Sequence, residues 1–193
     1  STVMAALSRI VALEVLADFD EALTLTSHIE LITVRRMIER EVTRIIWADA
    51  PGDRAQAVDT AVRWAQAISD PVTRYEALAY AAEGAATTDL PRAQEIAQGI
   101  PDAEPRDLAL RLIVQTIAES NPDTAQNLLG RIETPLQRNL AGAILIMRRD
   151  TEAPDPSTRE VWLCEAYLHV DFDGDGHAEY RKVTKVGKTI LDN

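Results

Sequence analysis

An internal repeat is the feature that most constrains the fold of this chain. Three stretches of nineteen residues align without gaps, beginning at Trp64, Ile96 and Leu128. They share four columns whose members lie 32 residues apart: Arg74, Arg106 and Arg138; Ile68, Ile100 and Ile132; Ala77, Ala109 and Ala141; and Ala61, Ala93 and Ala125. A fixed period of this length is typical of proteins built from stacked repeats.

Each repeat predicts a pair of helices. The first helix has apolar residues at spacings of three and four, as in Ala61, Trp64, Ala65 and Ile68. Prolines then mark the turn or the first turn of a second helix, at Pro71, Pro101, Pro105 and Pro135. An earlier copy covers residues 22–35 if "WADAPGD" is an insertion, and "SRIVALEVLAD" is a half unit before it. We therefore expect an α-solenoid over residues 1–150.

The repeat is similar to tetratricopeptide-like and HEAT-like α-helical repeats over residues 20–150. The similarity lies in the period and in the columns of small residues. The Trp, Gly and Tyr signature of the tetratricopeptide repeat is missing, so the resemblance concerns the architecture and not a subfamily.

The arginine column has two open interpretations. Arg74, Arg106 and Arg138 each fall near the start of a second helix. There the guanidinium can reach the carbonyl end of the preceding helix, or an acidic neighbour such as Asp70 or Asp102. Alternatively, the three arginines line a groove that binds an acidic protein segment. The first role is structural and the second is protein interaction.

The C-terminal part of the chain has a different pattern. Residues 151–160 contain two prolines and no periodicity, which predicts a linker. Val161–Val170 alternates and is rich in β-forming residues, "AEYRKVTKV" is its predicted partner, and "VGKTI" adds a last short strand. The predicted fold class is therefore mainly α, a solenoid of helical hairpins with a small antiparallel β-meander at residues 161–193.

An acidic loop, "DFDGDGHAE", separates the first two predicted strands. Asp171, Asp173, Asp175 and Glu179 supply oxygen ligands at spacings that suit Ca²⁺. The helix-loop-helix form of such a site needs a glutamate at the twelfth place, where this chain has Lys182. The alternative is a hairpin turn in which the glycines take positive φ and the aspartates cap backbone N–H groups.

The last segment carries a resemblance to a known family. "DPSTREVWLCEAYLHVDFDGDGHAEYRKVTKVGKTILDN", residues 155–193, resembles a segment of the portal proteins of tailed bacteriophages, particularly those of short-tailed phages. The resemblance implies a structural role in a ring-shaped oligomer through which the genome passes, without catalytic residues. Lysine occurs only at Lys182, Lys185 and Lys188, which also suggests a composite of a repeat protein and a portal-like segment.

Composition excludes several classes of protein. A net charge of −11 disfavours binding to nucleic acid phosphates, and a lone cysteine, Cys164, allows no internal disulfide. No apolar run is long enough for a membrane span, and the N-terminal residues do not resemble a signal peptide, so we expect a cytoplasmic or virion location. No catalytic motif is present.

We expect a non-catalytic assembly module that binds a protein partner or itself and needs no cofactor. The alternative function is a binding module stabilised by Ca²⁺ at the acidic loop.

Overall fold

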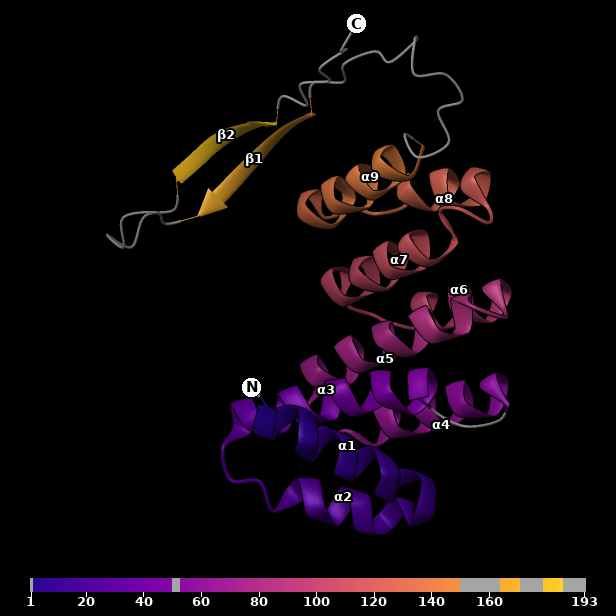
Figure 1. The fold of residues 1–193 in the computed structure, drawn as a ribbon, viewed down its shortest axis with the longest axis vertical. Coiled ribbons are helices and arrows are strands. Elements are labelled where there is room, and N and C mark those ends of the chain that lie inside the picture. The colour runs from indigo at the N-terminus through magenta and orange to yellow at the C-terminus, as the bar shows by residue number, and fades with distance from the viewer. Residues whose placement is uncertain (1, 50–52, 150–163, 171–178, 186–193) are drawn as a thin grey trace, which may run out of the picture. The chain divides into compact units, whose positions relative to one another are not determined.

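The computed structural model describes residues 2–49, 53–149, 164–170 and 179–185, and among these the side chains of residues 3–49 and 53–145 (Figure 1). The chain divides into two compact units, Ser1–Thr151 and Glu152–Asn193. The described part of the first unit is a series of helices: α1 (Thr2–Ala17), α2 (Phe19–Ser27), α3 (Ile32–Asp49), α4 (Arg54–Ala67), α5 (Pro71–Ala86), α6 (Leu90–Gln98), α7 (Ala103–Ile117), α8 (Pro122–Leu129) and α9 (Pro135–Arg149).

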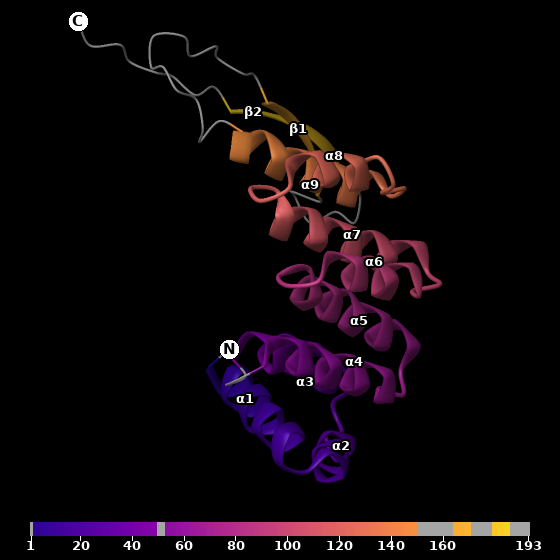
Figure 2. The ribbon, with the colours of Figure 1, turned by 90° about the vertical axis from the view of Figure 1, so that its right-hand side faces the viewer.

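The first unit has two layers of helices. The odd-numbered helices α1, α3, α5, α7 and α9 form one layer, in which each contacts the next. The shorter helices α2, α4, α6 and α8 form the other layer and pack against the long helices before and after them. Figures 1 and 2 show this order as a column that runs from α1 and α2 at one end to α8 and α9 at the other.

Local signals begin most of these helices. Asp18, Asp53, Asp70, Asp89 and Asn121 are N-cap residues whose side chains accept hydrogen bonds from backbone N–H groups of the first turn. Proline occupies the first turn of α5, α6 and α8, where its missing N–H costs nothing. The starts of these helices are therefore encoded locally.

The repeat columns form the core of the first unit. The isoleucine column and both alanine columns are buried, with exposed fractions of 2% or less. Alanine has a small side chain, so helices that meet at these positions can approach closely. Trp64 fills the space between α4 and its neighbours, and its indole N–H donates to the Glu39 carbonyl at 2.9 Å. The columns that defined the repeat in the sequence thus define the core.

A second close contact joins α3 to α5. Trp47 lies over Gly84, and a Cβ atom added to Gly84 would come within 2.5 Å of Trp47 Cγ. Trp47 belongs to the predicted "WADAPGD" insertion, of which Trp47, Ala48 and Asp49 extend α3. The extra residues therefore contribute to packing between neighbouring repeats.

In the second unit, β1 (Cys164–Val170) and β2 (Glu179–Lys185) form an antiparallel pair. Their register runs from Cys164 opposite Lys185 to Val170 opposite Glu179. The sheet contains these two strands and no other in the described residues.

The predicted fold class is wrong. The packed body of the protein is helical throughout its described residues, and the strands outside it make a single pair, whereas a β-meander needs at least three. Alternation of apolar and polar residues predicts an extended segment, but it does not fix how many strands pair. The segment predicted as the last strand lies outside the described residues.

No helix in the described ranges combines the length and the apolar character that crossing a membrane requires.

Replacement of Gly84 by alanine tests the contact between α3 and α5. We expect Gly84→Ala to lower the free energy of unfolding by about 1–3 kcal/mol, because the new methyl group collides with the Trp47 ring. Gly142→Ala in α9 is the matched control, since its Cβ would meet nothing within 4 Å. Chemical denaturation should show the control unchanged or stabilised by up to about 1 kcal/mol. Equal effects of the two changes would contradict the close contact.

Candidate functional site

The arginine column occupies the turns between paired helices. Arg74 Nε donates to the Ile68 carbonyl at 2.8 Å, and Arg138 Nε donates to the Ile132 carbonyl at 2.7 Å. Arg35 repeats the contact with the Ile29 carbonyl at 3.0 Å. In each turn the arginine lies six residues after the isoleucine and satisfies a carbonyl that the end of the preceding helix leaves free.

Arg106 departs from this pattern. Its Nε makes no hydrogen bond among the described residues, and its Nη1 lies 3.4 Å from the Pro101 carbonyl. Its Nη2 instead lies 3.4 Å from Glu133 Oε1, in the following repeat. Arg106 therefore keeps one long contact with its own turn and adds a contact with the next repeat, whereas the other three arginines bind their own turns through Nε.

These contacts show where Arg74, Arg106 and Arg138 lie, but they do not test whether the three residues bind another protein. Arg74 and Arg138 make the hydrogen bonds expected of the structural interpretation, and the protein-interaction role of the column remains a prediction. The predicted acidic neighbour Asp70 pairs with Arg36 at 2.9 Å rather than with Arg74. Thr73 also donates its backbone N–H and its hydroxyl to Asp70, and these hydrogen bonds are the main reason that the pKa of Asp70 is lowered.

Asp107 is a key residue that the sequence analysis missed. It follows Arg106, its side chain is fully buried, and its Oδ2 accepts hydrogen bonds from the backbone N–H groups of Glu133 and Thr134 at 2.9 and 2.6 Å. These two N–H groups immediately precede α9, so Asp107 on α7 caps the neighbouring repeat. The equivalent positions hold Arg36, Tyr75 and Asn139, so no column marks it.

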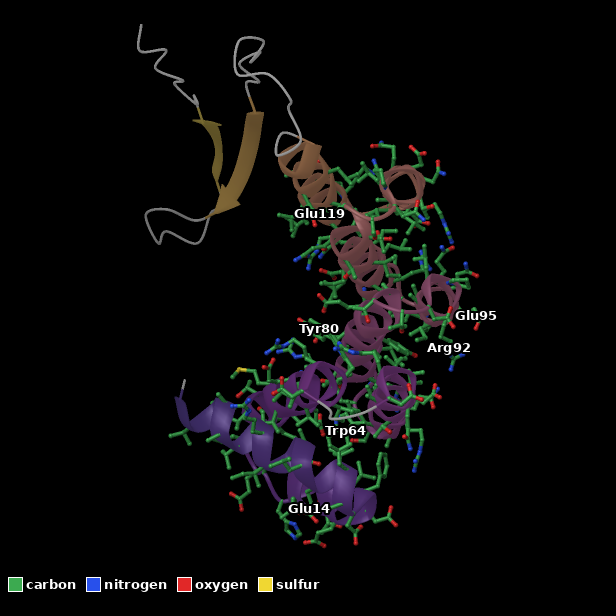
Figure 3. The ribbon with its side chains drawn as sticks, turned by 45° about the vertical axis from the view of Figure 1, so that its right-hand side comes forward. Glu14, Trp64, Tyr80, Arg92, Glu95 and Glu119 are labelled. Atoms are coloured by element: carbon green, nitrogen blue, oxygen red, sulfur yellow. The ribbon has the colours of Figure 1, made fainter. Side chains whose placement is uncertain are left out.

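The long-helix layer presents a row of charged residues. Arg36 pairs with Asp70, and Arg40 pairs with Glu76 at 2.7 Å, so α3 and α5 are joined by ion pairs. Burial raises the pKa of Glu83, and the positive charges of Arg44 and Arg111, which lower it, only partly offset this effect. The pairs hold neighbouring helices in register along this layer. In Figure 3, Arg92 and Glu95 on α6 lie on the opposite, short-helix side.

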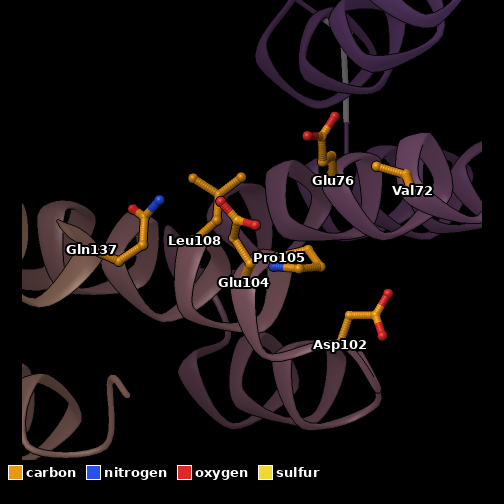
Figure 4. Close-up of a pocket in the computed structure, with 7 residues that line it drawn as sticks. All are labelled: Val72, Glu76, Asp102, Glu104, Pro105, Leu108 and Gln137. Atoms are coloured by element: carbon orange, nitrogen blue, oxygen red, sulfur yellow. The ribbon is translucent and has the colours of Figure 1, made fainter. Parts of the chain in front are cut away.

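A shallow pocket of about 290 Å³ opens where α5, α7 and α9 meet, as Figure 4 shows. Its lining consists of Val72, Glu76, Asp102, Glu104, Pro105, Leu108 and Gln137. These side chains are carboxylates, an amide and apolar groups. They supply polar and apolar contacts for a binding surface.

A second pocket of about 420 Å³ lies near the turn before α9. It is lined by Ala97, Gln98, Arg106, Leu110, Gly130, Arg131 and Glu133. This pocket contains two arginines, one of them the exceptional member of the repeat column.

The predicted calcium loop lies almost entirely outside the described residues. Asp171, Asp173 and Asp175 belong to the range 171–178, and Glu179 is the first residue of β2, opposite Val170. Within the described residues, no group of three or more His, Cys, Asp or Glu side chains is arranged to hold a metal ion. Calcium binding by the loop remains a prediction.

Comparison with known proteins supports the portal resemblance. The family model described as the phage SU10 portal protein matches residues 130–193. The match contains the predicted segment 155–193 and extends back to Gly130, so it includes α9, β1 and β2. No curated protein and no solved structure matches the chain. The resemblance to tetratricopeptide and HEAT repeats finds no support in these comparisons.

Loss of the Asp107 carboxylate should destabilise the protein. Asp107→Ala leaves the Glu133 and Thr134 N–H groups without their acceptor, so we expect the free energy of unfolding to fall by about 2 kcal/mol. Asp102→Ala is the control, because Asp102 is an exposed N-cap residue without a side-chain cap bond. Its cost should stay below about 0.5 kcal/mol. Chemical denaturation measures both, and an equal cost would contradict the capping role.

The two half-buried or buried glutamates predict how stability depends on pH. Burial is the main cause that raises the pKa of Glu39 and of Glu83 above the ordinary value of 4.5. The folded state then binds these protons more tightly than the unfolded chain, so stability falls as the pH rises from 4.5 through the raised values. Asp70, whose pKa is lowered, contributes only to changes below its ordinary value of 3.8.

The double variant Glu39→Gln/Glu83→Gln should show a smaller fall in unfolding free energy than the wild type over this pH range. Denaturation midpoints at pH values on both sides of the transition measure the fall. Glu30→Gln, an exposed change between α2 and α3, should keep the wild-type slope. An unchanged slope in the double variant would exclude the two glutamates as its source.

Proposed function

We propose that this protein is a non-catalytic component of phage particle assembly that acts through protein contacts, including contacts with further copies of itself. The observation that carries the proposal is the match of residues 130–193 to a phage portal protein family. Portal proteins are structural, which supports a non-enzymatic role. The family match also supports a location in the virion.

The position of the match within the fold strengthens this proposal. The match begins at Gly130, inside the helical unit, and α9 is therefore both the last helix of the repeat and part of the portal-like segment. Ala141 and Leu145 of α9 belong to the same core cluster as Ile113 of α7. The α9 part of the portal-like segment is thus held in the helical unit by burial of its apolar side chains.

This anchoring also bears on the composite interpretation. A junction at Asp155 does not agree with a match that starts at Gly130. The match and the repeat overlap in α9, which carries Arg138 and Ala141 of the repeat columns.

The strand pair supports self-association. Two strands alone are marginally stable in water, and each has an outer edge with backbone groups available for pairing. The pair β1–β2 is the only sheet in the described residues, so both of its edges remain open there. Addition of a strand from another copy would satisfy an edge and extend the sheet.

Native mass spectrometry of the full chain tests the proposal. We expect assemblies at multiples of the monomer mass. The variant Tyr167→Pro/Leu168→Pro removes two successive backbone N–H groups from the middle of β1, one of which faces β2 in an antiparallel ladder. It should shift the population toward the monomer.

Circular dichroism should show that the helical signal of this variant is retained. A wild-type chain that stays monomeric at the highest concentration it tolerates would contradict self-association. Assemblies that the proline variant leaves intact would instead place the contact outside the strand pair.

A further inference from the structure

The pocket before α9 is lined by side chains from α6, from α7 and from the turn between α8 and α9. Ala97 and Gln98 come from the end of α6, Arg106 and Leu110 from α7, and Arg131 from the turn between α8 and α9. Ala97 and Leu110 are buried, so they form an apolar floor beneath the polar groups. The pocket, at about 420 Å³, has room for a side chain of a partner protein.

Arg106 has hydrogen-bond donors to offer in this pocket. The other members of its column use Nε and Nη2 to bind carbonyl groups of their own turns, as Arg138 does at 2.7 and 3.2 Å. Arg106 makes one long contact of 3.4 Å with a carbonyl, and its Nε has no partner among the described residues. Its side chain is 28% exposed, so the free donors are within reach of a ligand.

Arg131 adds a second positive charge. Its side chain is exposed, and its guanidinium group makes no hydrogen bond or ion pair within the part of the chain that the structure describes. Two guanidinium groups that line one pocket create a strong preference for an anion, and their planar donor pattern suits a carboxylate.

Glu133 shows which chemical group this pocket accepts. Its carboxylate lies 3.4 Å from Arg106 Nη2, and its side chain is 70% exposed, so solvent weakens the pair. An incoming carboxylate that binds both arginines would displace Glu133 at small cost. Glu133 is therefore a weak internal competitor for the ligand.

We propose that the pocket formed by Gln98, Arg106, Leu110 and Arg131 binds a glutamate or aspartate side chain of an acidic segment in a partner protein. The apolar floor contacts the aliphatic part of the side chain, and the arginines bind its carboxylate. A carboxylate at the end of a short aliphatic side chain suits two guanidinium groups beside the apolar floor of Ala97 and Leu110, so a protein segment rather than nucleic acid is the source of the anion.

This inference goes beyond the proposed assembly role and does not depend on it. The arginine pocket lies in the helical unit, and binding there requires neither self-association nor the strand pair. A failure of one proposal therefore leaves the other intact.

Fluorescence anisotropy with a labelled hexaglutamate peptide tests the site. We expect the full chain to bind the peptide and the variant Arg106→Gln/Arg131→Gln to bind it about tenfold more weakly, since it loses the charge-assisted hydrogen bonds. Arg54→Gln/Arg92→Gln is the matched control, with the same change of net charge at exposed positions elsewhere. It should stay close to the wild type.

A second variant gives an effect of opposite sign. Glu133→Gln removes the internal competitor and should tighten peptide binding about threefold, whereas a purely structural role of Arg106 predicts no gain. Arg131→Gln alone, at an exposed position, keeps the test valid if changes at Arg106 unfold the protein.

Three results would overturn the proposal. The first is the absence of peptide binding by the wild-type chain. The second is equal weakening by the site and control pairs, which would show attraction to net charge alone. The third is tighter binding of a ten-nucleotide single-stranded DNA than of the peptide, which would identify phosphate as the preferred anion.

Discussion

The hydrogen bond between an arginine and the carbonyl of the isoleucine six residues before it is the interaction on which the turns between paired helices depend. A helix ends with carbonyl groups that have no partner inside it, and such a group is costly when it lies against a core. Arg35, Arg74 and Arg138 each donate an Nε hydrogen bond to the carbonyl of the isoleucine six residues earlier. The isoleucine side chain can then stay in the core while the chain reverses direction.

The exception in this series shows how neighbouring repeats are joined. In the repeat that contains α7, the arginine keeps only a long contact with its own turn and also contacts Glu133 of the next repeat, and the following residue, Asp107, caps the backbone ahead of α9. Oδ2 of this buried carboxylate accepts two backbone hydrogen bonds, which offset part of the cost of burial, while Oδ1 has no hydrogen-bond partner among the described residues. The same repeat therefore carries both the Asp107 cap on its neighbour and the arginine of the proposed binding pocket.

The portal-like segment takes part in this arrangement. Glu133 and Thr134, which Asp107 caps, lie inside the matched residues 130–193, whereas Asp107 itself lies outside them. The hydrogen bonds that cap α9 therefore join a residue outside the matched range to two residues inside it.

The sequence determined the repeat, the helix starts and the core columns. These features depend on local chemistry: N-cap residues and prolines act within one turn of a helix, and apolar spacing fixes one buried face. The sequence also placed a β segment at the C-terminus. The prediction of a meander was wrong, because alternation of apolar and polar residues does not determine how many strands pair.

Only the tertiary structure decided which polar groups meet. Arg106 is identical to its column partners in the sequence, yet it alone of the column also contacts the next repeat, and Asp107 has no counterpart that would mark it. Such contacts join residues 26 or 27 positions apart, and their geometry follows from how one helical pair packs on the next. Periodicity reports what all repeats share, whereas the candidate site arises where one repeat differs from the others.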